Sequence, residues 1–239
     1  MCSPDISYSN GEYLLTFNSW GAEHPNGEHN WLFSMVSPDL EKWSEPSPVG
    51  TNLNKDHRVI DIAVAYENNK YFVIWKDEKY DNYGKKKYQT RIGVCKRLNG
   101  DLAYIGDGCP RFERVDGLGS KFIHENYEFI NIDRNWYLLT TDYGPHRPTL
   151  YQMKEGRDGS KDEDWMSWCN GRDFDIPVEK FNTNHPANAA FLADWRKYDG
   201  YFYLIYGGRT HGLTHAGRGN NKLGIARSSD LKKWIVPPN

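Results

Sequence analysis

Short apolar and aromatic runs alternate with polar turn residues along most of the chain, which is the pattern of short β-strands. The clearest example is the stretch 120–130, followed after a turn at 133–135 by a second apolar run at 136–139. A His-Glu pair stands where the first of these strands begins, although strand interiors favour β-branched and aromatic residues. Nothing in the chain has the spacing of a long amphipathic helix. The pattern therefore predicts an all-β protein.

Four segments of the chain share one plan: a polar residue, an apolar strand, a turn of Gly, Asn or Asp, and an aromatic strand. They begin at Asp5, Asp61, Glu125 and Asn188, so that 56, 64 and 63 residues separate successive starts. Their turns, such as Asn10-Gly11, carry residues that tolerate the positive φ of tight hairpins. A period of this length, with about four strands in each unit, predicts the blades of a β-propeller around a central channel.

The outer strands of the units support this interpretation. The segments 31–43 and 223–234 both end in the motif Ser-x-Asp-Leu-x-x-Trp, and the segments 89–95 and 149–153 fill the same place in the middle two units. We therefore expect residues 1–239 to form a single β-propeller domain.

The first residues of the four units are expected to converge, because each innermost propeller strand begins near the axis. Three of these residues, Asp5, Asp61 and Glu125, carry carboxyl groups. Carboxylates that lie close together raise one another's pKa, so that one group stays protonated while another is ionised. Cleavage of a glycosidic bond requires such a pair. For any one of the three, capping a strand or facing solvent is the alternative.

Composition narrows the choice of partner. The formal net charge of −2 gives no electrostatic reason to expect a nucleic acid or an acidic membrane, and no apolar run is long enough to span a membrane. Aromatic residues make up 15% of the chain, which suits both a β-rich core and stacking on sugar rings. The cysteines are interpreted as free thiols, with a Cys95–Cys109 bridge as the alternative. No signal peptide precedes Met1, so the protein is expected to be cytoplasmic, or secreted or periplasmic if a signal peptide was removed.

Short motifs that together span nearly the whole chain resemble those of a known family. They are Pro4-Asp5-Ile6 with Asn10-Gly11-Glu12-Tyr13, Val59-Ile60-Asp61 with Asn69-Lys70-Tyr71-Phe72, Glu125 with Asn135-Trp136-Tyr137-Leu138, and Ala226-Arg227-Ser228-Ser229-Asp230-Leu231 with Trp234. They are similar to the motifs of five-bladed β-propeller glycosidases, above all glycoside hydrolase family 43, which includes arabinanases, arabinofuranosidases and xylosidases. The resemblance implies a five-bladed propeller of which four repeats are visible in this chain.

The resemblance also implies roles for particular residues. Glu125 matches the general acid, and Asp61 matches the carboxylate that orients this acid and tunes its pKa. The chain departs from the family at Asn126-Tyr127, which replaces the usual Gly-Pro. His124 is similar to a histidine beside a glutamate in the neoagarooligosaccharide hydrolases of family 117, so it is a rival proton donor.

The identity of the general base is open at this point. Asp5 matches the base if its unit is the first blade. Alternatively Asp5 belongs to the second blade, whose pattern it fits better, and the chain lacks its first blade or is a four-bladed variant. The leading hypothesis is an inverting glycosidase that acts on plant or algal polysaccharides of the arabinan or xylan type. The second is a non-catalytic carbohydrate-binding propeller that has lost its base. A protein-interaction propeller is disfavoured because its Gly-His…Trp-Asp motif is absent.

Further residues are candidates for contact with a sugar, each with a structural alternative. His185 precedes the fourth inner strand and either faces the channel or is a turn histidine. Arg147 and Arg209 follow aromatic strands and either contact the sugar or lie on the surface. Trp20 and Trp75 end aromatic strands and either stack on a sugar or pack between blades. No cofactor is expected to be required, although the resemblance leaves room for a structural or channel-bound calcium ion near His185. The sequence does not indicate an oligomeric state.

Overall fold

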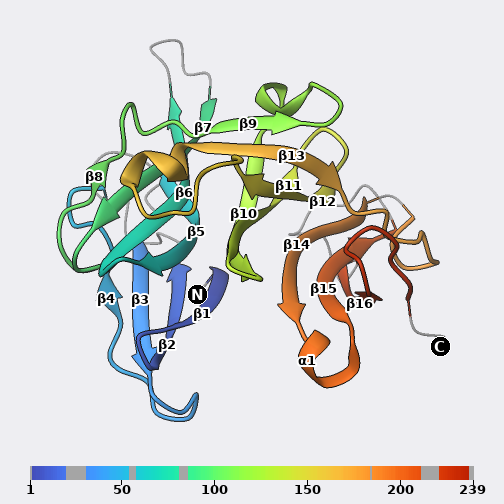
Figure 1. Ribbon diagram of the computed structural model, residues 1–239, viewed down its shortest axis with the longest axis horizontal. Helices are drawn as coiled ribbons and strands as arrows, with labels where there is room; N and C mark the ends of the chain where they lie inside the picture. Colours follow the sequence, from blue (N-terminus) through green and yellow to red (C-terminus); the bar gives the residue numbers. More distant parts are fainter. Residues whose placement is uncertain are drawn as a thin grey trace.

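Four largely antiparallel sheets stand around a common centre in the computed structural model (Figure 1). The structure describes residues 2–19, 31–53, 58–80, 86–183, 185–210 and 221–236. Each sheet corresponds to one of the four predicted repeats, and we number the sheets as blades 1 to 4 in chain order. The inner strands of successive blades contact one another, because β1 meets β5, β5 meets β10, and β10 meets β14.

The blades are built as follows. Blade 1 contains β1 (Cys2–Ser9), β2 (Glu12–Asn18), β3 (Leu32–Ser37) and β4 (Ser47–Pro48). Blade 2 contains β5 (Arg58–Glu67), β6 (Lys70–Tyr80), β7 (Lys86–Cys95) and β8 (Ala103–Tyr104). Blade 3 contains β10 (His124–Ile132), β11 (Asn135–Asp142), β12 (Arg147–Met153), β13 (Ser167–Asp173) and, parallel to β13, β9 (Arg111–Arg114). Blade 4 contains β14 (His185–Asp194), β15 (Phe202–Arg209) and β16 (Asn221–Ser228).

The helices are short. They are the 3-10 helices η1 (Gly119–Lys121) and η2 (Asp162–Met166) and the α-helix α1 (Arg196–Asp199). None of the helices in the described ranges has the length and apolar character needed to cross a membrane. The all-β propeller and its four repeats are confirmed. The fifth blade is not: the described residues form four sheets.

Hydrophobic layers between neighbouring blades hold the ring together. Leu14, Val73 and Trp75 lie in the layer between blades 1 and 2. Phe72 and Trp165 lie in the layer between blades 2 and 3, with their rings stacked at 4.2 Å. A third layer, between blades 3 and 4, holds residues such as Leu139, Leu192, Leu204 and Trp234. Each layer removes apolar surface from water, which is the main stabilising contribution to such a fold.

The predicted turns have the expected backbone conformation. Asn10-Gly11, Asn68-Asn69 and Asp133-Arg134 all have positive φ at both positions, as two-residue hairpin loops with matching twist require. In blade 4 the corresponding connection contains α1 and ends at Gly200, whose φ is +86°. The hairpin signals in the sequence therefore positioned the strands correctly.

The repeated Ser-x-Asp-Leu-x-x-Trp motif has a structural explanation. In blade 1 the Ser37 hydroxyl accepts a hydrogen bond from the Leu40 amide, and Asp39 accepts bonds from the next two amides, each at 2.9 Å. In blade 4 the Ser228 hydroxyl accepts a hydrogen bond from the Asp230 amide, and Asp230 accepts bonds from the Lys232 and Lys233 amides. The motif therefore closes a tight turn after the third strand of each of these two blades.

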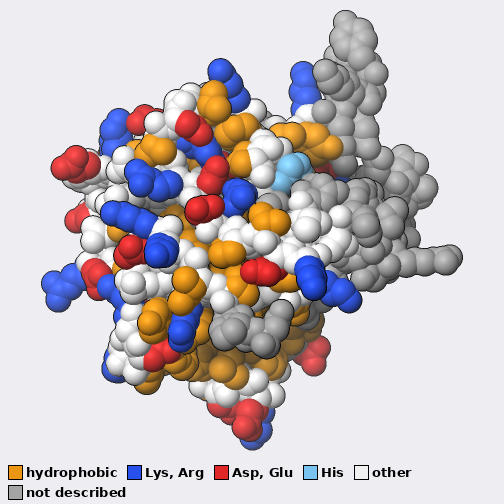
Figure 2. All heavy atoms as spheres, turned by 90° about the vertical axis from the view of Figure 1, so that its right-hand side faces the viewer, with side chains coloured by type: hydrophobic (Ala, Val, Ile, Leu, Met, Phe, Trp, Pro, Cys, Tyr) orange, Lys and Arg blue, Asp and Glu red, His pale blue; other side chains and the backbone are white. Residues whose placement is uncertain are grey.

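Blades 1 and 4 each have one face that no described sheet covers, and apolar side chains lie on these faces. Ile6 and Tyr8 are exposed on blade 1, and Ile205, Ile225 and Leu223, the last 83% exposed, lie on blade 4. Figure 2, which faces the blade 4 side of the molecule, shows hydrophobic atoms gathered in the lower half of this face. These exposed side chains are of the same apolar type as those that pack between neighbouring blades.

Candidate active site

A backbone irregularity recurs at the start of each inner strand. Ser3, Asp61, Asn126 and Ala189 have φ of 44°, 56°, 53° and 46°, and each lies where the pairing of its strand shifts register. Non-glycine residues occupy this region at a cost of roughly 1–3 kcal/mol each, and a bulge re-aims the side chains beside it. Four occurrences at equivalent places show that the bulge belongs to the repeat itself.

The position of this bulge shows that the sequence aligned the wrong residues of the four blades as equivalent. The residues equivalent to Asp61 in the other blades are Ser3, Asn126 and Ala189, rather than Asp5, Glu125 and Asn188. Asp5 therefore lies two positions beyond the bulge of β1, and a hydroxyl group occupies the place where a carboxylate was expected. Sequence comparison of the repeats missed this because the bulge changes no hydrophobic position.

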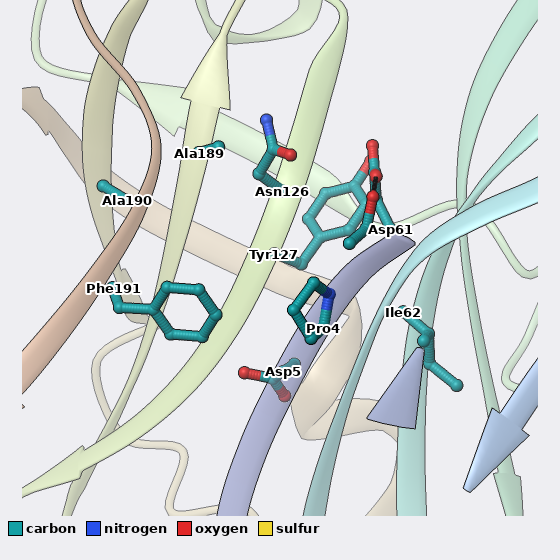
Figure 3. A pocket seen from close by; sticks show the side chains of 10 residues that line it. Pro4, Asp5, Asp61, Ile62, Asn126, Tyr127, Ala189, Ala190 and Phe191 are labelled. Carbon is teal, nitrogen blue, oxygen red and sulfur yellow. Dashed lines mark hydrogen bonds between the residues drawn. The ribbon is translucent and has the colours of Figure 1, made fainter. Parts of the chain in front are cut away.

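The bulges surround a small cavity of about 70 Å³ at the centre of the ring (Figure 3). Its walls come from the inner strands of all four blades. They are Ser3, Pro4, Asp5, Asp61, Ile62, Asn126, Tyr127, Ala189, Ala190 and Phe191. Two predicted catalytic residues, Asp5 and Asp61, thus line the same cavity, and a space of this size can hold a few water molecules.

Asp61 is a buried carboxyl group with several hydrogen-bond donors. The Ser3 hydroxyl donates to its Oδ1 at 2.5 Å, and the Asn126 backbone amide also donates to the carboxyl group. Burial raises the pKa of Asp61 above its ordinary value, against the effect of the Ser3 hydrogen bond and of the positive charge of Lys76. Asp61 can therefore hold a proton more readily than an exposed aspartate.

Glu125 is joined to blade 2 through a buried lysine. The Lys76 ammonium group contacts Glu125 Oε1 and lies 2.8 Å from Glu78 Oε1, and the other Glu78 oxygen lies 2.8 Å from Arg58. The side chain of Lys76 is 3% exposed and that of Glu125 is 14% exposed. Since Lys76 also acts on Asp61 by its charge, Lys76 brings the two predicted catalytic carboxyl groups into one cluster.

Asp5 has a different environment from Asp61. The amides of Val64 and Ile6 donate to its carboxyl group, but Oδ1 has no hydrogen-bond partner among the described residues. Burial raises the pKa of Asp5 to about 7. Burial and the neighbouring charge of Asp5 also raise the pKa of Glu128 well above its ordinary value. Asp5 and Glu128 therefore form a second acidic pair, whereas Figure 3 shows Asp5 on the far side of Pro4 from Asp61.

His124 lies outside the cavity. Its Nδ1 is 2.7 Å from Asp142 Oδ1 and its Nε2 is 3.2 Å from the Gly119 carbonyl oxygen, so both ring nitrogens face acceptors. The residue is 5% exposed. Asp142 in turn accepts hydrogen bonds from Arg114 and Tyr151. The structure thus places this rival proton donor in a buried polar network behind the strand that carries Glu125.

Solved structures share this architecture, although no family model and no curated protein matches the sequence. An endo-arabinase from Bacteroides thetaiotaomicron aligns with a TM-score of 0.61 at 15% identity, over 100% of this chain and 80% of its own. An exo-β-1,3-galactanase from Clostridium thermocellum aligns with a TM-score of 0.63 at 15% identity, over 98% of this chain and 47% of its own. A xylan β-1,4-xylosidase from Bacillus halodurans aligns with a TM-score of 0.60 at 15% identity, over 100% and 42%.

The fold is that of the family-43 glycoside hydrolases. At this identity the likeness establishes the fold, and the chain spans less than half the length of several of the proteins that it matches. The function of this propeller therefore depends on its own side chains.

Four side chains lie near the cluster around Lys76, and we call them the rim: Tyr88, Tyr143, His146 and Arg209. The ring centroids of Tyr88 and Tyr143 lie 4.4 Å and 6.0 Å from the Lys76 ammonium nitrogen. Burial raises the pKa of Tyr143, Asp61 raises it further, and the charge of Arg209 opposes both. Burial and the same arginine lower the pKa of His146. The predicted contact residue Arg209 therefore lies beside two other polar side chains of this rim.

The remaining predicted contact residues are placed differently. Arg147 donates to the carbonyl oxygens of Phe174 and Ile176 at 3.2 Å and 3.4 Å, which ties it to the segment after β13. Trp75 is fully buried between blades 1 and 2, so it packs between blades and has no face for a sugar. Trp20 and the side chain of His185 lie outside the described residues.

The calcium ion expected near His185 stays a prediction, because the side chain of His185 lies outside the described residues. Calcium takes six to eight oxygen ligands, and the described ranges contain no group of three or more His, Cys, Asp or Glu residues arranged to hold an ion. Cys95, Cys109 and Cys169 are free thiols in the structure, so Cys95 and Cys109 form no bridge.

The sequence analysis missed Lys76 and Glu78. Both stand in β6 directly after an apolar run, where charged side chains are unusual. Both are buried, at 3% exposure each. Charged residues that continue a buried strand were the signal that could have revealed them, because a buried charge needs a partner.

Proposed function

We propose that this protein is a glycoside hydrolase that cleaves O-glycosyl bonds in plant or algal oligosaccharides and polysaccharides of the arabinan or xylan type. The observation that carries the proposal is the convergence on Lys76 of Asp61, which lines the central cavity, and Glu125, which is not among the lining residues, in a propeller with the fold of family-43 hydrolases. The fold likeness to an endo-arabinase, a xylosidase and a galactanase supports the choice of substrate class.

In this proposal Glu125 protonates the glycosidic oxygen and Asp61 orients Glu125. The aromatic rim of Tyr88 and Tyr143 offers flat surfaces for a sugar ring. An inverting mechanism also needs a base about 6.5–9.5 Å from the acid, so that a water molecule fits between them. Asp5 is the proposed base, since it lines the cavity and has a carboxyl oxygen without a partner.

The test uses Glu125→Gln, which keeps the shape of the side chain and removes the transferable proton. We expect release of reducing sugar from arabinan or xylan oligosaccharides to fall by roughly a hundredfold to ten-thousandfold, the usual contribution of a general acid. Binding of the same oligosaccharides should persist. An aryl glycoside whose leaving group needs no proton should be cleaved at a rate close to that of the wild type. Unchanged hydrolysis of the natural linkages by Glu125→Gln would refute the role of Glu125.

A second candidate, a carbohydrate-binding propeller without turnover, is favoured by one observation. Ser3 occupies the position equivalent to Asp61 in the first blade, so the bulge that could carry a third carboxylate carries a hydroxyl. The two candidates differ in the wild type. Binding of the oligosaccharides without any release of reducing sugar would favour the binding protein, whereas release that depends on Glu125 would favour the hydrolase.

A further inference from the structure

The proposed proton donor is held by a positive charge. A carboxyl group in contact with an ammonium group favours its ionised form, because an opposite charge within about 4–6 Å stabilises the anion. Lys76 contacts Glu125 while its side chain is 3% exposed, so the water that would screen this attraction is largely excluded. The contact with Lys76 therefore favours Glu125 as a carboxylate, although the proposed reaction needs it as an acid.

The charge balance of the cluster supports the same conclusion. Lys76 and Arg58 bring two positive charges, whereas Glu78, Glu125 and Asp61 bring three negative charges when all are ionised. Among these five described side chains, one proton therefore balances the charges. Glu125 and Glu78 each contact a cation, whereas Asp61 accepts hydrogen bonds from Ser3 and Asn126. Asp61 is therefore the better place for that proton.

Polar and titratable side chains also surround the Lys76–Glu125 pair. Glu78 faces it from β6, and Arg58 and Asp61 face it from β5. The rings of Tyr88 on β7 and Tyr143 after β11 lie beside the Lys76 ammonium group. Arg209 and His146 belong to the same rim, since both Arg209 and Asp61 act on Tyr143 and Arg209 acts on His146. Burial lowers the pKa of Lys76, while Glu78 and Asp61 oppose this effect.

We propose that Lys76 is a positioning residue that holds Glu125 as a carboxylate through their buried contact, so that this contact must loosen before Glu125 can act as an acid. Once the contact is loosened, Glu125 takes up a proton from a hydronium ion of the solvent, which leaves as water, and then transfers this proton to the glycosidic oxygen; deprotonation of the attacking water returns one proton to the solvent. This inference rests on the proposed hydrolase function for its consequence, but the Lys76–Glu125 coupling can be measured without any turnover.

The experiment is a ¹³C titration of the side-chain carboxyl groups, with the Glu125 signal assigned by its absence in Glu125→Gln. Replacing Lys76 by Met removes the charge and keeps most of the side-chain volume. We expect the titration midpoint of Glu125 to rise by at least about one pH unit in Lys76→Met, which is a tenfold gain in proton affinity. Lys76→Arg, which keeps the charge, should leave the midpoint close to that of the wild type. An unchanged Glu125 midpoint in Lys76→Met would overturn the proposal.

Lys79→Met is the matched control. Lys79 lies on the same strand, is 44% exposed and is 3.8 Å from Asp77. Its replacement should leave the Glu125 titration unchanged. If Lys76→Met does not fold, the reciprocal measurement in Glu125→Gln decides the matter, because loss of the carboxylate should lower the midpoint of the Lys76 ammonium group. No change in the Lys76 midpoint would refute the coupling.

Kinetics then separate the two proposals. If the protein hydrolyses sugars, the limb of the kcat/KM profile that reports Glu125 should move to higher pH in Lys76→Met and stay in place in Lys76→Arg. A purely structural lysine would lower activity without moving this limb, which would also overturn the positioning role. If neither wild type nor variants hydrolyse any substrate while the titration shift is observed, the proposed function fails and the Lys76–Glu125 coupling stands.

Discussion

His124 and Glu125 are neighbours on β10, yet their side chains enter two different polar regions. His124 belongs to a buried network with Asp142 and Arg114, in which the acceptors of Asp142 are used by several donors. Glu125 belongs to the cluster with Lys76, which borders a cavity. Successive strand residues point to opposite faces, so one backbone step separates the two regions.

The two regions differ in whether hydrogen bonds or burial decides the pKa of the central aspartate. Burial opposes ionisation of Asp142, but hydrogen bonds from His124, Thr140 and Tyr151 lower its pKa below the ordinary value. Asp61, by contrast, has a raised pKa because burial outweighs its hydrogen bonds. Hydrogen bonds thus favour the ionised form of Asp142, whereas burial favours the protonated form of Asp61. Proton transfer is therefore expected on the Glu125 side of the strand.

The sharpest test of this comparison is to break the paired network. Arg114 lies 2.7 Å from both Asp142 and Asp173, and its side chain is 4% exposed. We expect Arg114→Met to lower the free energy of unfolding by roughly 3–5 kcal/mol, because the buried carboxylates lose their cation. Urea unfolding at pH 7 measures this loss.

A matched control is available on the same strand. Arg111 lies 2.6 Å from Asp107 with both side chains more than half exposed, at 60% and 56%. Arg111→Met should change the free energy of unfolding by less than about 1 kcal/mol, as is usual for exposed ion pairs. Equal effects of the two substitutions would show that burial and pairing do not distinguish the network.

Much of the fold was predictable because it rests on local signals. Hairpin turns such as Asn10-Gly11 determine strand pairing over a few residues, and the strand pattern repeats with each blade. The repeat also predicted carboxyl groups near the axis, and Asp61 is one of them. The fifth blade came from the resemblance rather than from a repeat in this chain, and it was not found in the described residues.

The composition of the candidate site was harder to predict because it depends on contacts between blades. Lys76 meets Glu125 across an interface between strands 49 positions apart in the chain, and no local pattern encodes that distance. The bulge at Ser3 shifted Asp5 away from the predicted position without changing any apolar residue. Positive φ at a non-glycine residue is visible only in the folded backbone.

Asp5 provides a smaller test, because its carboxyl group is buried and one of its oxygens has no hydrogen-bond partner among the described residues. Its pKa in the folded protein is about 7, above the ordinary value of 3.8, so the folded state binds this proton more tightly than the unfolded state. The stabilisation is fully present below pH 4 and is lost as the pH rises towards 7. The wild type should therefore lose up to about 4 kcal/mol between pH 4 and pH 8 that Asp5→Asn does not lose. Urea titrations of both proteins across this range measure the difference, and a constant difference would mean that Asp5 is already ionised in the folded protein at pH 4.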